Sequence, residues 1–139
     1  MSTPHERMRA LGWGLELLML MGDDATIPVD CRDQARSLSL RYPVSASLKE
    51  LLASGTKRLP PEVGSSMDDA RRLFEKLQRC GAGTAATRHV LLYTLRHFPL
   101  RSACDWADAC DGGLQAWLQP DGPDAPDQMS ERLRIATGG

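Results

Sequence analysis

Hydrophobic residues recur along the first part of this chain at the spacing of one helix face. Residues three and four positions apart lie on the same side of a helix, and such a stripe runs through residues 5–21. It consists of Met8, Leu11, Leu15, Leu18 and Met21, widened by Leu17 and Leu20. Gly12 and Gly14 weaken its early turns, which indicates either fraying or the close approach of a neighbouring backbone. The pattern predicts a strongly apolar first helix.

Two shorter helices are predicted next. Pro28 suits the start of a helix, because its missing N–H would have no partner there. In the residues that follow, 29–42, the apolar side chains fall on one side of a helix. That side holds Ala35, Leu38 and Tyr42, and Pro43 ends the helix. Ser47 and Glu50 have the spacing of a capping box, which predicts a short third helix over about 46–54. Residues 55–66 contain two Pro and two Gly without periodicity, and predict a loop.

A fourth and a fifth helix follow this loop. Ser66 stands three residues before Asp69, so the fourth helix is predicted over 66–80, ending near Gly81. Thr84 or Thr87 opens the fifth helix, predicted over 85–98 and stopped by a proline. Its inward side is predicted to hold Leu91, Leu92, Leu95 and Phe98.

The last third of the chain changes in composition after residue 118. Ser102 predicts the start of a sixth helix, which Gly112 and Gly113 interrupt before the apolar run LQAWL. The following stretch, QPDGPDAPDQ, offers no side chain that fills a core. We therefore expect a helical domain over 1–118 and a flexible acidic tail, rich in Pro and Gly, over 119–139.

No stretch combines β-branched residues with an alternation of apolar and polar positions, so the sequence predicts an all-α fold, a small bundle of five to six helices. Two parts of the chain also match at an offset of 56 residues. Leu17 aligns with Leu73, Leu18 with Phe74, Met21 with Leu77, Arg32 with Arg88, Tyr42 with Phe98, and Pro43 with Pro99. This is compatible with two stacked helix-loop-helix units, although unrelated amphipathic helices show similar matches.

The opening TPHERMRAL, followed by ELL, an acidic pair, IP and the helix end SLRYP, resembles a family of small uncharacterised proteobacterial proteins. Members of that family begin with a Pro-His-Glu-Arg-like run (PHERxRA) and continue to an LRHYP-like helix end. The resemblance covers the first 45 residues, while LRHFP at 95–99 is closer to the family's helix end than SLRYP is. It implies a bacterial, soluble, mainly helical protein, and it implies no activity or functional residue.

Composition narrows the class of protein further. The 139 residues suffice for one domain, and 42% hydrophobic with 25% charged residues is ordinary for a globular protein. The longest apolar run, residues 15–21, is far shorter than the ~20 residues of a membrane span, and the start lacks an export-signal pattern. We expect a cytoplasmic protein that does not contact membranes. Its four Cys have no metal-binding spacing and are expected to be thiols, although two disulfides are formally possible.

Residue types that carry catalysis do not cluster along the chain. His89 and His97 fall two helical turns apart, too distant to share a metal without other ligands. Asp105, Asp108 and Asp111 recur every three residues, which suits acid-base or metal chemistry but is more typical of a solvated acidic face. No phosphate-binding glycine loop is present. We therefore expect no enzymatic activity, no cofactor and no bound metal.

Charge is divided along the chain, although its net charge is only −1. Residues 71–101 carry seven Arg and Lys against one Glu, a net charge of +6, whereas residues 102–131 carry seven Asp and Glu and no Arg or Lys, a net charge of −7. A basic and aromatic face follows helical spacing on the fifth predicted helix. The candidate partner-binding residues are Arg88, His89, Tyr93, Arg96, His97 and Arg101.

These charges either solvate the helices and pair locally or form a surface that binds a partner. We expect a non-catalytic protein-binding module, an adaptor or regulator, rather than a nucleic-acid binder, because the whole chain is slightly acidic. Its expected partner is a protein with an acidic surface that meets the basic face. The alternative is a nucleic-acid-binding regulator that uses the basic helices 66–80 and 85–98, since glycine turns such as CGAGTAA also join helix-turn-helix pairs. The sequence does not indicate an oligomeric state.

Overall fold

The computed structural model of the chain describes residues 3–99 and 113–119, and this part holds six helices. They are α1 (Pro4–Asp23), α2 (Val29–Arg41), α3 (Ser45–Ala53), α4 (Pro61–Cys80), α5 (Ala85–His97) and α6 (Leu114–Trp117). No strand occurs among the described residues, and the predicted all-α fold is confirmed. The helix predicted from Ser102 and the tail from residue 120 lie outside them.

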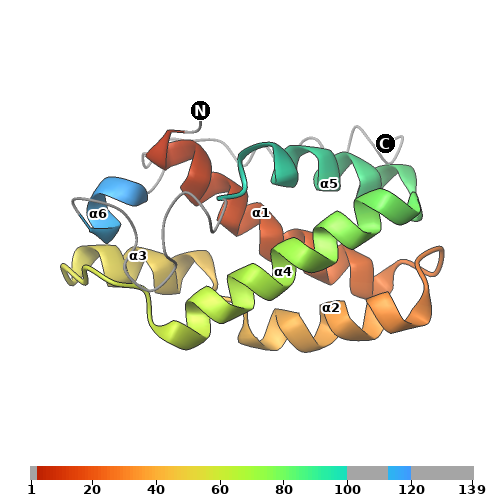
Figure 1. Cartoon of the computed structure of the whole chain (residues 1–139), viewed down its shortest axis with the longest axis horizontal. Coiled ribbons are helices and arrows are strands. Elements are labelled where there is room, and N and C mark those ends of the chain that lie inside the picture. The colour runs from red at the N-terminus through yellow and green to blue at the C-terminus, as the bar shows by residue number, and fades with distance from the viewer. Residues whose placement is uncertain (1–2, 100–112, 120–139) are drawn as a thin grey trace.

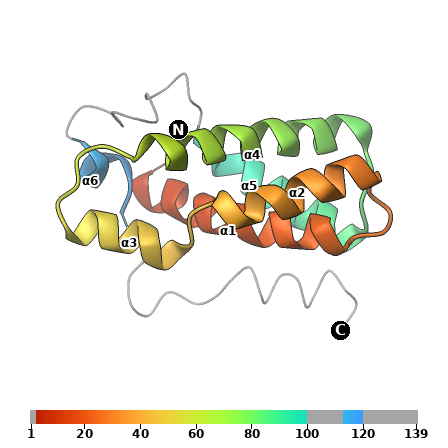
Figure 2. The ribbon, with the colours of Figure 1, turned by 90° about the horizontal axis from the view of Figure 1, so that it is seen from below.

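Four helices form the body of the bundle (Figure 1). α1 packs against α2 and α5, and α4 packs against the same two helices, so that the four enclose one core. α3 and α6 lie at the same end of this body in both views (Figure 1 and Figure 2). The pair α1–α2 is thus stacked on the pair α4–α5, which is the arrangement that the 56-residue match suggested.

Local capping signals explain several helix ends. Thr3 and Glu6 form a capping box at the start of α1, in which the Glu6 N–H donates to the Thr3 hydroxyl at 3.2 Å and the Thr3 N–H to Glu6 Oε1 at 3.0 Å. The Thr84 hydroxyl accepts the Thr87 N–H at the start of α5, one of the two starts that the sequence left open. Gly81 ends α4 as predicted, in the left-handed conformation at φ 72°.

The predicted start of α4 at Ser66 is wrong. The helix begins at Pro61, so the second half of the predicted loop over 55–66 is helical. Pro60 and Pro61 explain this start, because the first helical position needs no N–H partner and proline already has the required φ. Ser66 does not cap the helix, and its hydroxyl instead donates to the Val63 carbonyl at 2.7 Å within it.

The predicted capping box of Ser47 and Glu50 does not form. Tyr42 and Val44 have extended backbone, so the chain has left α2 and enters α3 directly at Ser45. Val44 is the N-cap residue and makes no side-chain capping bond. α3 therefore starts at Ser45, one residue before the predicted start at about residue 46.

The core extends from the four bundle helices to the end covered by α3 and α6. Leu114, Trp117 and Leu118 are buried there, together with Leu48 of α3. The Leu114 N–H donates to the Lys57 carbonyl at 3.0 Å, and Arg7 Nε donates to the Trp117 carbonyl at 2.9 Å. These bonds attach α6 both to α1 and to the segment after α3.

Tyr42 and Phe98, the aromatic residues that directly precede Pro43 and Pro99, both pack against one glycine of α1. The Tyr42 hydroxyl donates to the Leu11 carbonyl, and the Phe98 ring packs edge to face on Phe74 with 5.7 Å between centroids. A Cβ on Gly14 would lie 2.5 Å from the Tyr42 hydroxyl oxygen and 3.1 Å from the Phe98 ring. Gly14 therefore permits close approach, as one reading of the sequence held, but of aromatic side chains rather than of a backbone.

Candidate functional site

The predicted inward side of α5 is correct at Leu91 and Phe98, which are buried, but not at Leu92. Its buried residues are Thr87, Val90, Leu91 and Thr94. The prediction that Leu92 faces inward is wrong, since 64% of this residue is exposed, and Leu95 is only partly buried. The cause is that two threonines lie on the buried side of α5, where a hydrophobicity pattern counts them as polar.

A carboxylate from the turn between α1 and α2 accepts hydrogen bonds from the start of α5. Asp24 is buried, and it accepts the Thr87 hydroxyl at 2.7 Å and the Thr84 N–H at 2.9 Å. It also accepts the Thr26 hydroxyl at 2.6 Å and the Thr26 N–H at 2.9 Å. Burial alone would raise the pKa of Asp24, but the hydrogen bonds from Thr26, Thr84 and Thr87 outweigh it and hold the pKa well below its usual range. Asp24 thus joins two turns that are 60 residues apart in sequence, a link that no local pattern reveals.

Three predicted partner-binding residues line the seam between α5 and α1. The Tyr93 ring lies edge to face with His89 at 4.8 Å and with Trp13 of α1 at 6.3 Å, measured between centroids. His97 Nε2 lies 3.0 Å from Glu6 Oε2, and the two form an ion pair when His97 is protonated. Hydrogen bonding from Thr3 lowers the pKa of Glu6, and the charge of His97 adds to that lowering. His97 therefore helps to hold α1 and α5 together.

Much of the predicted basic block is engaged within the fold. Arg88 Nη1 donates to the Ala82 carbonyl at 2.8 Å, and Arg71 Nη1 donates to the Phe98 carbonyl at 3.0 Å. On α4, Arg72 pairs with Asp68 at 3.2 Å and Lys76 pairs with Asp30 of α2 at 3.5 Å. Arg101 lies outside the described residues. Arg96, by contrast, is exposed on the outer side of α5.

Arg96 borders a hollow of about 430 Å³ between α4 and α5, which we call the α5 hollow. It is lined by Gln78, Leu92, Tyr93, Leu95 and Arg96. Tyr93 and Arg96 belong to the predicted binding set, whereas Leu92 and Leu95 were assigned to the core. The hollow therefore combines apolar side chains with a cation at its rim, and only Tyr93 and Arg96 of its lining were predicted to bind a partner.

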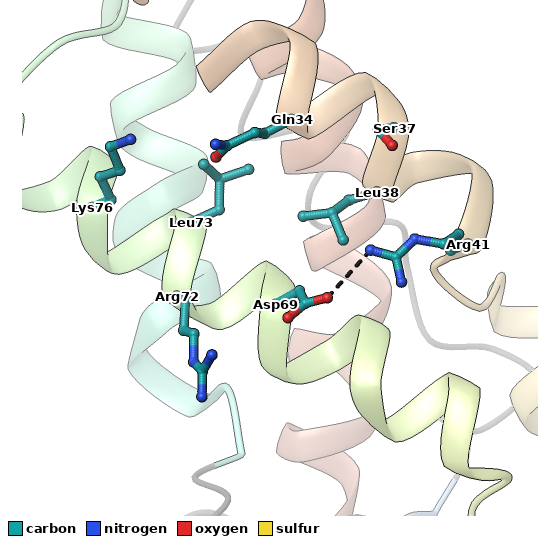
Figure 3. Close-up of a pocket in the computed structure, with 8 residues that line it drawn as sticks. All are labelled: Gln34, Ser37, Leu38, Arg41, Asp69, Arg72, Leu73 and Lys76. Atoms are coloured by element: carbon teal, nitrogen blue, oxygen red, sulfur yellow. Dashed lines mark hydrogen bonds and ion pairs between the residues drawn. The ribbon is translucent and has the colours of Figure 1, made fainter. Parts of the chain in front are cut away.

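A second hollow, the α2–α4 cleft, also measures about 430 Å³ and has a different character (Figure 3). It is lined by Gln34, Ser37, Leu38 and Arg41 from α2, and by Asp69, Arg72, Leu73 and Lys76 from α4. Both sets follow i, i+3, i+4, i+7 spacing, so each is one stripe of its helix. This cleft was not predicted from the sequence, because a stripe on one helix does not say which stripe of another helix it faces.

No metal site is present in the part of the chain that the structure describes, since no three His, Cys, Asp or Glu side chains gather there. The series Asp105, Asp108 and Asp111 lies outside that part. Cys31 is buried and Cys80 is exposed, and both are free thiols. Within residues 3–99 and 113–119, no helix has both the length and the apolar composition that crossing a bilayer requires.

No family model, curated protein or solved structure matches this chain. The resemblance of its first residues to small proteobacterial proteins remains an expectation. Function is therefore inferred from the geometry of the described residues.

Proposed function

We propose that this protein is a non-catalytic protein-binding module and that its partner inserts an apolar side chain into the α5 hollow. The observation that carries the proposal is the 64% exposure of Leu92 inside a concave, largely apolar site. Single exposed leucines are ordinary on protein surfaces. Leu92, however, lies beside Leu95 and Tyr93, so a side chain entering the hollow would gain apolar contact on several sides.

Charge favours a partner that is acidic next to this apolar side chain. Residues 85–97 include no Asp or Glu, and they carry Arg88 and Arg96 together with two histidines. Arg96 lines the hollow itself, within reach of a carboxylate placed beside the inserted group. A positive rim of this kind steers an acidic surface toward the hollow and increases the association rate.

The nucleic-acid alternative has less support from the geometry. A phosphate-binding face needs several cations that are available on one side of the molecule. Here Arg71 and Arg88, one from each of the two basic helices, donate to backbone carbonyls within the fold. As part of the same proposal we place the protein in a bacterial cytoplasm, on the resemblance of its first residues.

The proposal is tested by selecting peptides from a random displayed library on the immobilised full-length protein. We expect enriched peptides to carry an aliphatic side chain next to Asp or Glu. Leu92→Asp should weaken their binding by about tenfold or more, because it puts a carboxylate into the apolar site, and Arg96→Glu should weaken it similarly through repulsion.

Leu40→Asp is the matched control, since Leu40 of α2 is 88% exposed and lies outside the hollow. This variant should bind the selected peptides like the unmodified protein. Equal binding of the peptides by Leu92→Asp and Leu40→Asp would contradict the proposal. Tight binding of duplex DNA or single-stranded RNA at about 0.15 M salt, lost in Arg96→Glu, would instead support the nucleic-acid alternative.

A further inference from the structure

We propose that the α2–α4 cleft is a binding site for a small organic phosphate, a phosphate monoester with an apolar group. This site is separate from the α5 hollow and does not depend on the function proposed above. Its lining carries three cations, Arg41, Arg72 and Lys76, against the single carboxylate of Asp69. Each of these cations has a carboxylate partner in the fold, namely Asp69 for Arg41, Asp68 for Arg72 and Asp30 for Lys76, so a phosphate monoester dianion binds by displacing one of these carboxylates.

The cations reach the cleft from both of its walls. Arg41 extends from α2 and Lys76 from α4, near opposite ends of the cleft with Leu38 and Leu73 between them (Figure 3). Arg72 lies at the outer edge and points away from α2 in this arrangement (Figure 3). Gln34 and Ser37 add an amide and a hydroxyl that can hydrogen-bond phosphate oxygens.

The existing ion pairs leave these cations available for exchange. Arg41 Nη2 lies 3.2 Å from Asp69 Oδ2, and Lys76 Nζ lies 3.5 Å from Asp30 Oδ2. Roughly half of each cationic side chain is exposed, and solvent-exposed pairs of this kind are weak. A phosphate dianion with several acceptor oxygens can therefore replace an aspartate as the partner of a cation in this cleft.

The apolar part of the ligand is indicated by the two leucines of the lining. Leu38 and Leu73 lie between the charged groups, one from each helix, and both are largely buried core residues with an edge in the cleft (Figure 3). The volume of about 430 Å³ falls in the range of small-molecule sites, roughly 300–1,000 Å³. An aromatic or short aliphatic group fits over these leucines while the phosphate meets the cations at the rim.

Phenyl phosphate, inorganic phosphate and phenol are the probes for this site, titrated into the full-length protein at low and at physiological salt. We expect saturable binding of phenyl phosphate, with amide NMR shifts at Gln34, Ser37 and Asp69. Inorganic phosphate and phenol should each bind more weakly, because each has only half of the recognised chemistry. Lys76→Gln and Arg41→Gln should weaken binding of phenyl phosphate by about tenfold.

A gain of affinity gives the sharper test. Asp69→Asn removes the carboxylate that holds Arg41, so it should strengthen phenyl phosphate binding by about fivefold. Asp33→Asn makes the same change in net charge at an exposed pair with Arg36 outside the cleft, and should leave the affinity unchanged. Lys49→Gln on α3 is the corresponding control for Lys76→Gln.

Three results would overturn the proposal. The first is an absence of saturable phenyl phosphate binding while the protein remains folded by circular dichroism. The second is an equal effect of Asp69→Asn and Asp33→Asn, which would show that only overall charge matters. The third is equal affinity for inorganic and phenyl phosphate, which would remove the role of Leu38 and Leu73.

Discussion

Two buried threonines decide which side of α5 faces the core. Thr87 satisfies its hydroxyl by donating to Asp24 at 2.7 Å, so its burial costs little and ties the helix to a distant turn. Thr94 is equally buried, but its hydroxyl has no hydrogen-bond partner among the described residues. Two residues of the same type thus make opposite contributions within one helix, seven positions apart, because a buried hydroxyl stabilises only when it is bonded.

Thr94→Val and Thr87→Val are a matched pair that tests this difference. Valine has nearly the same shape without the hydroxyl, so Thr94→Val should raise the free energy of unfolding by about 1 kcal/mol. Thr87→Val should lower it by about 2 kcal/mol, because Asp24 then loses a charge-assisted hydrogen bond. Urea unfolding of both variants provides the measurement. A loss of stability in both would mean that the Thr94 hydroxyl is bonded after all.

The stability supplied by Asp24 should depend on pH. Its pKa lies below the ordinary value of 3.8 in the folded state, so the stabilisation is fully present above pH 3.8 and is lost as the pH falls further. Asp24→Asn should therefore lower the free energy of unfolding by about 2–3 kcal/mol at pH 7, and by less at pH 3. Denaturant unfolding at the two pH values measures this. Asp33→Asn, on the exposed side of α2, should change little at either pH, and a pH-independent loss in Asp24→Asn would refute the assignment.

At the scale of the element, Gly14 lowers the helix propensity of α1, but it leaves room for Tyr42 and Phe98 to pack against the helix. Gly14→Ala should lower the free energy of unfolding by about 1–3 kcal/mol, although alanine favours helix, because its Cβ meets the Tyr42 hydroxyl and the Phe98 ring. Gly12→Ala should be neutral or slightly stabilising, since its Cβ would meet only the Ser45 hydroxyl at 3.0 Å. Thermal unfolding of the two variants compares them. Equal stability of the two variants would show that the Tyr42 and Phe98 rings do not pack against Gly14.

Helix existence was predictable from the sequence, whereas helix orientation was not. Periodicity and the signals at Thr84, Gly81 and Pro43 act within a few residues, and these predictions are confirmed. The inward side of α5 depends instead on Asp24, 63 residues before Thr87, and the hydrophobicity pattern placed Leu92 inside. Tyr93 and Arg96 of the α5 hollow were predicted from charge and spacing. The α2–α4 cleft was not, because it exists only once two stripes from different helices face each other.

For the whole molecule, α6 holds the end of the bundle together through a few residues late in the chain. A protein ending after Gln119 keeps Leu114, Trp117 and Leu118, which are all buried, whereas one ending after Gly112 loses all three. The shorter protein should be less stable by several kcal/mol, since it opens the core and leaves the Lys57 carbonyl and Arg7 without their partners in α6. Circular dichroism during thermal unfolding compares the two. Equal midpoints would show that α6 covers the core without stabilising it.

The position of α1 between α2 and α5 has a consequence for synthesis on the ribosome. α1 is strongly apolar, and the side that meets α5 stays uncovered until residues that begin 62 positions after its own end have been made. At roughly 5–20 residues per second this takes about 3–12 s, far longer than a helix pair needs to collapse. During that interval the nascent chain exposes an apolar helix to its surroundings. The position of α5 in the gene, rather than the stability of the finished bundle, therefore determines how long the nascent chain can misassociate or meet a chaperone.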